Sequence, residues 1–384
     1  MRVRRFAVPA LVGALTVSGA GVQASALASA GGHARRCSAS SMSTVETRAA
    51  SISGIAIGRG CTVWAAGDDA GGGVLFSWSG HSWRRTHLRG LAEAELTAIT
   101  VGSAATWVVG DLIDGAKYEP LVLRLTSRGW RRIAAPAPAV GAYGNSLTAV
   151  TTSGSEAFAV GASATTSPYT SQALVLRWNG TKWYPVPTPA IPHSVLTGLA
   201  GVALSSKSYG WAVGQSDTGT TPQALIEHWN GRRWSVAASP AVPGMLSGVS
   251  ALSKKDAWAV GYQQTASGNA ALIEHWNGKR WSVVPDPSIA VYKAATDGSY
   301  LNDVAAISPK DVMATGQLGE TAGGALPILM RWNGAHWTTS KAPDPAPASS
   351  VTNLTAISGS AAAGFWLIGI YPSGGKTHSY ALHR

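Results

Sequence analysis

Charged residues, cysteines and long apolar runs are all scarce in this sequence. Only 13% of its 384 residues are charged, whereas 45% are apolar. This composition excludes a disordered chain and provides for a large core. After the N-terminal region no segment has about 18 uninterrupted apolar residues, so we expect a soluble mature chain without a transmembrane segment. Helical 3.6-residue periodicity is also absent from that region.

The common signatures of enzyme sites are missing as well. No G-x-S-x-G, H-E-x-x-H, P-loop or Cys-x-x-Cys pattern occurs. His228 and His275 recur at one repeat position, but they belong to different repeats and are not expected to converge as metal ligands must. We therefore predict no metal site and no cofactor. A catalytic pair assembled from distant residues stays open.

Residues 1–30 have the pattern of a secretory signal peptide. Three arginines precede a small-residue apolar stretch over 6–22, and A-x-A cleavage patterns follow at Ala24–Ala26 and Ala28–Ala30. We predict cleavage here, a linker over 31–41 and an extracellular location. An uncleaved membrane anchor is the alternative.

Glycine and tryptophan define an internal repeat of about 50 residues. A glycine that closes an apolar run recurs at Gly67, Gly110, Gly161, Gly214, Gly261, Gly316 and Gly369. Three residues before it stand Trp64, Trp107, Phe158, Trp211, Trp258, Met313 and Trp366. Two further tryptophan columns lie five residues apart, and the three columns contain all 16 tryptophans. We therefore interpret the tryptophans as repeat core rather than as ligand platforms.

Each repeat contains four short runs with strand character, and successive four-stranded units are typical of propeller blades. The repeats predict an all-β, seven-bladed β-propeller over 42–384, with four antiparallel strands per blade. The last repeat stops before its fourth strand, and Met42–Arg48 precedes the first repeat. We predict that an N-terminal strand from this segment completes the last blade. A disordered tail beside a three-stranded blade is the alternative.

The two cysteines lie near the start of this repeat array. Cys37 precedes the first repeat and Cys61 lies within it. Outside the reducing cytosol, two cysteines favour one disulfide, which would tie the N-terminal segment to the first repeat. Two unpaired buried thiols are the alternative.

Two kinds of turn are predicted within the repeats. Asn-Gly between the third and fourth runs is typical of a type I′ hairpin, in which Trp229 would pair with Arg232. Ser253-x-x-Asp256 resembles the Asp-box of sialidases but lacks its glycine and threonine. We interpret it, with the similar Ser308-x-x-Asp311, as a turn whose Ser and Asp bond the local backbone.

The order of these runs resembles the kelch family and, more broadly, propellers of the galactose-oxidase type. The second run ends in glycine, and a tryptophan opens the fourth run, which leads to proline. The chain departs from kelch repeats in having one glycine instead of two, and Trp-Asn-Gly-x-x-Trp instead of a tyrosine before the tryptophan. It is also similar to secreted repeat proteins of high-GC Gram-positive bacteria. These resemblances imply a propeller and no particular activity.

Variable polar and aromatic loops are where a rigid scaffold usually carries its sites. In a propeller, the loops between second and third strands share one face with the loops between blades. The candidate ligand contacts on this face are Asp68, Asp111, Tyr262, Gln263, Tyr292 and Tyr300.

Two glutamates and a set of basic residues stand out elsewhere. Glu227 and Glu274 replace apolar residues of other repeats, and we expect each to bond an indole N–H or a neighbouring blade, or else a sugar hydroxyl. The formal charge is +11. Basic residues gather at the hairpins between third and fourth strands. We interpret them either as solvated turn residues or as a basic rim that binds an anionic polymer. They are Arg84, Arg85, Arg131, Arg132, Lys182, Arg232, Arg233, Lys279 and Arg280.

The sequence therefore favours a secreted, monomeric binding module that contacts a glycan or a protein through the loop face. The first alternative is an extracellular enzyme acting on a polysaccharide or small molecule at the channel mouth. Its acids would come from Asp68, Asp111, Glu119, Asp297 and Glu320. The second alternative is a structural envelope protein recognised through the basic rim.

Overall fold

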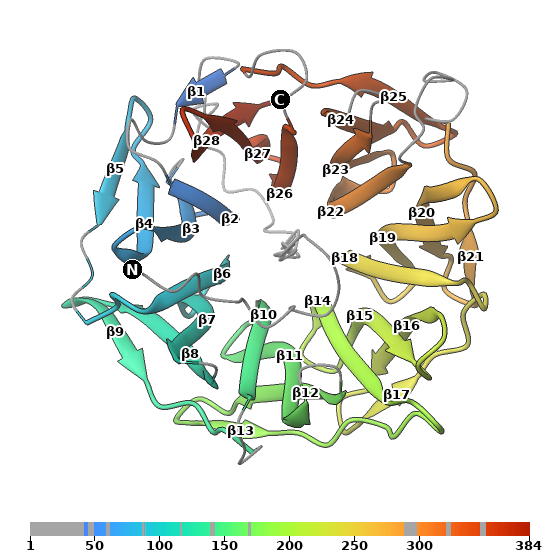
Figure 1. Cartoon of the computed structure of the whole chain (residues 1–384), viewed down its shortest axis with the longest axis horizontal. Coiled ribbons are helices and arrows are strands. Elements are labelled where there is room, and N and C mark those ends of the chain that lie inside the picture. Colours follow the sequence, from blue (N-terminus) through green and yellow to red (C-terminus); the bar gives the residue numbers. More distant parts are fainter. Residues whose placement is uncertain are drawn as a thin grey trace, which may run out of the picture.

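The computed structural model of the chain is a ring of β-strands around a central axis (Figure 1). It describes residues 42–44, 50–58, 62–86, 88, 90–115, 117–138, 143–167, 170–287, 298–319, 324–345 and 351–384. No helix occurs within these residues, and the all-β class predicted from the sequence is confirmed for them.

Successive strands form antiparallel groups that run from the centre of the ring to its periphery (Figure 1). The inner strands are β2 (Ala50–Ile57), β6 (Ala94–Val101), β10 (Gly144–Ser153), β14 (Leu196–Ser206), β18 (Gly244–Ser253), β22 (Ser299–Ser308) and β26 (Asn353–Ser360). The second strands are β3 (Val63–Asp69), β7 (Thr106–Asp114), β11 (Glu156–Ser167), β15 (Tyr209–Asp217), β19 (Asp256–Thr265), β23 (Asp311–Gly319) and β27 (Gly364–Ser373).

The third and outermost strands complete these groups. The third strands are β4 (Gly72–Trp78), β8 (Lys117–Thr126), β12 (Thr170–Trp178), β16 (Pro222–Trp229), β20 (Gly268–Trp276), β24 (Ala325–Trp332) and β28 (Lys376–His383). The outermost strands are β5 (Trp83–Thr86), β9 (Gly129–Ile133), β13 (Trp183–Pro185), β17 (Trp234–Val236), β21 (Trp281–Val283), β25 (Trp337–Lys341) and β1 (Met42–Thr44). The groups beginning at β6, β10 and β14 are joined by single parallel pairs, Gly144 with Tyr118 and Ser171 with Leu196, into 12 connected strands. We call each group of four strands a sheet.

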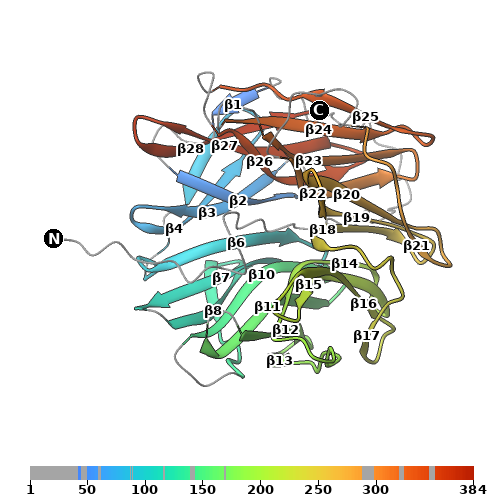
Figure 2. The same cartoon turned by 45° about the vertical axis from the view of Figure 1, so that its right-hand side comes forward.

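The N-terminal strand belongs to the last group. β1 pairs antiparallel with β28, with Met42 opposite Leu382, and lies beside it in both views (Figure 1, Figure 2). The predicted pairing of this segment with the last repeat is therefore present. At the same seam Ser379 Oγ accepts a hydrogen bond from Ile52 N at 3.0 Å, and Thr355 Oγ1 donates to Ile52 O at 3.1 Å. These bonds join the last group to the first. Cys37 and Cys61 lie outside the described residues.

Every inner strand contains a β-bulge at the same place. A bulge re-aims the side chain of its extra residue, and where that residue is threonine or asparagine the structure shows it bonded to the inner strand of the next sheet. Thr97 Oγ1 donates to Leu147 O at 2.7 Å, and Thr148 Oγ1 donates to Leu199 O at 2.7 Å. The bulges thus link neighbouring sheets close to the axis.

The recurring glycine lies opposite the bulge because the inner strand presses against it. A Cβ atom on Gly261 would lie 2.0 Å from Met245 O, and one on Gly214 would lie 2.0 Å from Gly198 O. No side chain fits at such a distance unless the inner strand moves. Six of the glycines in the sequence repeat therefore mark a steric contact between the first two strands of their group, whereas a Cβ on Gly369 would instead meet the ring of Tyr380 on β28.

The tryptophans interlock neighbouring sheets, which confirms their assignment to the core. Trp107 lies between two tryptophans of the next sheet, with ring centroids 4.9 Å from Trp178 and 5.1 Å from Trp183. Phe158 meets Trp229 and Trp234 in the same way, at 5.0 and 5.6 Å. Each such aromatic pair adds about 0.5–1.5 kcal/mol beyond the buried area. The sheets are therefore held together by aromatic contacts away from the axis.

The Asn-Gly turns are longer than predicted. Trp229 pairs with Trp234 rather than with Arg232. Asn230 Oδ1 accepts hydrogen bonds from the amides of Arg232 and Arg233, at 2.9 and 3.0 Å. The type I′ prediction is wrong, since the glycines of these turns have positive φ but the asparagines do not. The asparagine side chain stabilises the longer turn and sets the two tryptophans opposite each other.

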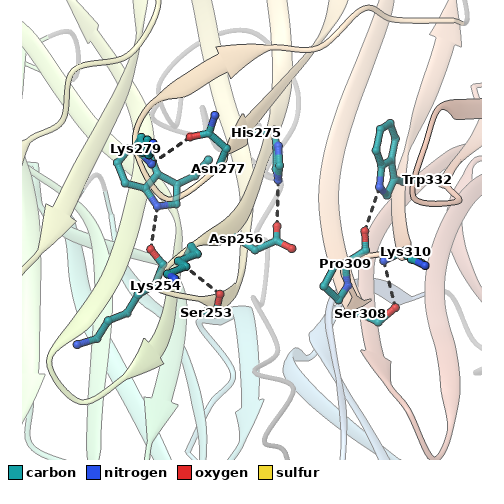
Figure 3. A network of polar contacts seen from close by, with 12 residues as sticks. Ser253, Lys254, Asp256, His275, Asn277, Lys279, Ser308, Pro309, Lys310 and Trp332 are labelled. Atoms are coloured by element: carbon teal, nitrogen blue, oxygen red, sulfur yellow. Dashed lines mark hydrogen bonds and ion pairs between the residues drawn. The ribbon is translucent and has the colours of Figure 1, made fainter.

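The turns between inner and second strands agree with the prediction in part. Ser253 Oγ and Ser308 Oγ each accept a hydrogen bond from the amide two residues later, at 3.1 and 3.3 Å. Asp256 does not bond the local backbone as expected. Its Oδ1 lies 3.0 Å from Nε2 of His275 on the third strand (Figure 3).

The close contact between the recurring glycine and the inner strand predicts that a larger residue at this position destabilises the fold. Gly261→Ala should lower the free energy of unfolding by about 1–3 kcal/mol, because the added methyl group forces the inner strand to move. Denaturant unfolding measures the change. Gly71→Ala is the control, since its Cβ would meet only the Oδ1 atom of Asp69, at 3.2 Å. Equal stability of the two variants would contradict the steric account.

Candidate functional site

The residue after each recurring glycine occupies one level of the ring. Asp68, Asp111 and Tyr262 are at this level, near the ends of β3, β7 and β19. The inner strands begin at this same end of the ring, which we call the mouth face. The three residues, and Gln263 after them, thus belong to strands rather than to the loops in which they were expected from the sequence. Tyr292 lies outside the described residues.

Residues at this level meet the start of the next inner strand. Asp68 is near Glu95 on β6, Asp111 bonds Ser146 on β10, and Tyr262 contacts Tyr300 on β22. Glu95, Ser146 and Tyr300 all lie just before a bulge. The mouth face is therefore a circle of junctions between sheets. Its chemistry changes from one junction to the next.

The tyrosine junction is aromatic and hydrogen-bonding. The rings of Tyr262 and Tyr300 have centroids 5.3 Å apart, and Nδ2 of Asn269 donates to the Tyr300 hydroxyl at 2.5 Å. Burial, Tyr300 and the carboxylate of Asp217 raise the pKa of Tyr262, so its hydroxyl stays protonated at neutral pH. Gln263 follows Tyr262 along β19 and is half-buried. This junction offers aromatic faces, hydroxyls and amides without a formal charge of its own.

The carboxylate junction holds a proton near neutral pH. Burial, followed by the charges of Glu95 and Asp69, raises the pKa of Asp68 to about 7. Asp68 is half-buried, whereas the side chain of Glu95 is exposed to solvent. Burial also raises the pKa of Glu95, so the junction pairs two carboxyl groups whose pKa values both lie above the ordinary range, as is common where general acid–base chemistry occurs.

Asp111 lies in the interior and joins two sheets. Its carboxylate accepts hydrogen bonds from Ser146 Oγ at 2.6 Å and from Leu147 N at 2.9 Å. Burial raises its pKa to about 7, although both hydrogen bonds act in the opposite direction. Only 3% of its surface is exposed. The contacts of Asp111 are thus those of a structural residue, and its predicted contact with a ligand stays a prediction.

Sequence reasoning missed two buried polar residues near the axis. Asp303 follows the bulge of β22, where Gly54 and Ala98 stand in other sheets. It accepts hydrogen bonds from Val304 N at 2.8 Å and Ile357 N at 2.9 Å, and burial raises its pKa to about 8. Gln215 is 1% exposed, and its amide has no partner among the described residues. An aspartate at a glycine or alanine position was the signal available in the sequence.

Glu227 and Glu274 lack the partner that was expected from the sequence. Both are fully buried on third strands, and neither carboxyl has a hydrogen-bond partner within the described part of the chain. Burial raises the pKa of Glu227 to about 8 and that of Glu274 to about 7. The expected bond to an indole N–H is absent, so burial favours the neutral acid form of both side chains.

Comparisons with known proteins identify the fold. The sequence matches no family model and no curated protein. Virginiamycin B lyase from Staphylococcus aureus, in an inactive form with quinupristin, is similar with a TM-score of 0.56 and 12% identity, over 89% of this chain and 98% of that one. YCF48 from Cyanidioschyzon merolae is similar with a TM-score of 0.54 and 16% identity, over 90% of this chain and 99% of that one. An ulvan lyase of polysaccharide lyase family PL25 is similar with a TM-score of 0.54 and 9% identity, over 88% of this chain and 92% of that one.

The chain thus has a β-propeller fold. Identities this low show the fold and nothing of the activity. The similar structures give no support to the kelch or galactose-oxidase resemblance that the repeat pattern suggested. In the part of the chain that the structure describes, no helix has the length and apolar character to cross a membrane.

Stability should depend on pH through the buried glutamates. In the unfolded chain they titrate near 4.5, the ordinary pKa of a glutamate, so the folded state holds more protons above that pH. Their contribution to stability is full below pH 4.5 and is lost as pH rises to about 8. Glu227→Gln should reduce this loss of stability between low and high pH by up to a few kcal/mol, because one unit of pKa shift corresponds to about 1.4 kcal/mol.

Urea unfolding of both proteins between about pH 5 and about pH 8 measures this difference. Glu119→Gln is the matched control, because the side chain of Glu119 is 45% exposed and its ion pair among the described residues is with the equally exposed Lys117. The control should follow the wild-type pH profile. A profile of Glu227→Gln that parallels wild type would show that the carboxyl is not buried as a neutral acid.

Proposed function

We propose that the chain is a secreted binding module that holds a glycan or a protein segment at the mouth face of a seven-bladed propeller. Each group of four strands is one blade, and β1 completes the last. Residues 1–30 act as a signal peptide, Cys37 and Cys61 form a disulfide, and the mature chain is a monomer. The kelch-like assignment stays a hypothesis from the repeat pattern.

The tyrosine junction is the observation that carries this proposal. Two aromatic rings from neighbouring sheets lie at one end of a rigid scaffold, together with amide and hydroxyl groups. Sugars and peptides are both recognised by aromatic faces combined with a few directed polar groups. Among similar propellers, YCF48 was determined with a D1 peptide and the ulvan lyase with a glucuronate–rhamnose-sulfate chain. These ligands support the two ligand classes proposed here.

Binding should depend on the tyrosines. Tyr262→Ala and Tyr300→Ala are each expected to weaken binding by about tenfold, or about 1.4 kcal/mol, through loss of an aromatic face. The mature chain from Gly31 onward is tested against glycan and peptide arrays at low and high salt. Retained binding at high salt is expected, because the contacts are not ionic.

Tyr184→Ala is the control for the tyrosine variants. Tyr184 is a half-buried tyrosine of outermost strand β13, away from the mouth face. The control should bind like wild type. If Tyr262→Ala and Tyr300→Ala also bind like wild type, the tyrosine junction is not the site. If no array component binds at either salt concentration, the proposed ligand classes are wrong.

The carboxylate junction favours catalysis as a second candidate function. In the hydrolysis of a polysaccharide that spans the mouth face, protonated Asp68 would donate its proton to the leaving glycosidic oxygen, while the Glu95 carboxylate takes a proton from the attacking water, so that the C–O bond breaks as the bond to the water oxygen forms. The proximity of Asp68 and Glu95 and the raised pKa values of both carboxyls are the observations that favour this function.

Catalysis and binding are separated by one substitution. Asp68→Asn keeps the shape of the side chain but removes the proton, and should lower turnover of any cleaved polysaccharide by about 100-fold or more. Its affinity for the same polysaccharide should change little. Product release is followed by reducing ends or ultraviolet absorbance. Absence of cleavage by the unmodified chain for every bound polysaccharide would rule out the enzymatic hypothesis and leave the binding module.

A further inference from the structure

Basic residues recur along the outer rim of the ring, and three arginines border one groove at β9. The sequence predicted basic residues at the hairpins before the outermost strands, and the structure divides them into two sets. Lys182, Arg232, Arg233, Lys279 and Arg280 lie in hairpin turns. Arg84 and Arg85 belong to β5, and Arg131 and Arg132 to β9. The outer rim is therefore unequal around the ring.

A groove runs along the edge formed by β9. It has a volume of about 580 Å³, with Leu88 and Leu91 on one side. On the other side lie Leu123, Trp130 and three arginines, Arg128, Arg131 and Arg132. A second cavity of about 470 Å³ also has Arg132 in its wall, together with Glu119. Arg132 thus borders both hollows, and the acidic Glu119 lies only in the second one.

The three arginines of the groove have no carboxylate partner within the described residues. Arg85 on the neighbouring edge strand does have one, since Nη2 lies 2.6 Å from Asp69 Oδ2. Arg124, opposite Arg131 on β8, does not line the groove, because its guanidinium lies over the rings of Trp107 and Trp178, 5.1 and 5.4 Å from their centroids. The charge is thus available to a ligand.

We propose that this groove binds an acidic polysaccharide. Arginine forks form paired hydrogen bonds with carboxylate and sulfate groups. The leucines, and the part of the half-buried Trp130 ring that is not in contact with Trp64, offer apolar surface to the C–H faces of sugar rings. The site is separate from the mouth face, because β9 is an outermost strand, whereas the mouth junctions lie on inner and second strands (Figure 1).

The groove fits nucleic acids and membranes less well. Single-stranded nucleic acid needs successive aromatic rings on which bases stack, and Trp130 is the one aromatic residue among those that line the groove. Its ring already meets Trp64 edge-on, with centroids 5.4 Å apart. A membrane surface would be met by protruding apolar side chains. The large exposed ones within the described chain are Val195, Val236, Val283 and Val351, all away from this groove.

The test compares two charge-matched double variants of the mature chain. Arg131→Ser with Arg132→Ser removes two groove arginines, and Arg232→Ser with Arg233→Ser removes two arginines of a hairpin on another sheet. Binding to polygalacturonate is measured by calorimetry over a range of salt, with neutral dextran as a second ligand. The groove variant should lose about tenfold or more in affinity and show a smaller salt dependence. The hairpin variant should stay within about twofold of wild type.

A third variant separates geometry from charge. Arg131→Lys with Arg132→Lys keeps both charges but loses the guanidinium fork, so its affinity should fall between wild type and the serine variant. Unchanged unfolding midpoints show that all variants fold. Equal losses in the groove and hairpin variants would overturn the proposal in favour of diffuse attraction. So would absence of binding, or tighter binding of single-stranded DNA or phosphatidylglycerol vesicles than of polygalacturonate. Mutation of Tyr262 should leave this binding unchanged, which separates it from the mouth face.

Discussion

The β-bulge in each inner strand is the constraint on which the rest of the ring depends. In the first six groups it presses the inner strand against the second strand, where only glycine leaves enough room, and in several groups it turns a polar side chain toward the next inner strand. Because Thr97, Thr148 and Thr355 each bond the neighbouring inner strand at the same level, the register of one sheet fixes that of the next. In a closed ring a slipped register would break bonds on both sides. The bulges therefore align the sheets, and the aromatic contacts farther out hold them together.

The same constraint explains why the fold could be predicted from the sequence and the site could not. Glycine and tryptophan recur because the backbone contact and the aromatic interlock are the same in each group, so their spacing predicted the strands and the core. The β1 pairing was predictable from the missing last strand. The junction between Asp68 and Glu95 was not, since it depends on how two sheets meet and no spacing within one repeat encodes that. Turn length was also missed, because Asn230 acts through its side chain rather than its φ angle.

The residues at the mouth-face junctions can differ from one sheet to the next, because their side chains take no part in the contact between glycine and inner strand or in the tryptophan contacts. The glycine and the bulge fix the backbone at each junction, while the side chains there meet the next sheet or solvent. Asp111 accepts a hydrogen bond from the neighbouring strand β10, whereas Tyr262 and Tyr300 place aromatic rings at the mouth face. A rigid frame with variable junctions can thus change its ligand without changing its fold.

The two candidate surfaces differ in charge, and one ligand therefore does not suit both equally. At the mouth face burial raises the pKa values of Asp68 and Glu95, and the tyrosine junction has no formal charge of its own. Arg128, Arg131 and Arg132 make the groove at the edge of β9 positive. Attraction at this exposed groove is screened within about 8 Å at physiological salt, whereas stacking on the tyrosines is not screened. Salt therefore acts on the two surfaces differently. A chain held first by the rim could present a different, uncharged segment or partner to the mouth, because the two surfaces lie on different strands of the ring.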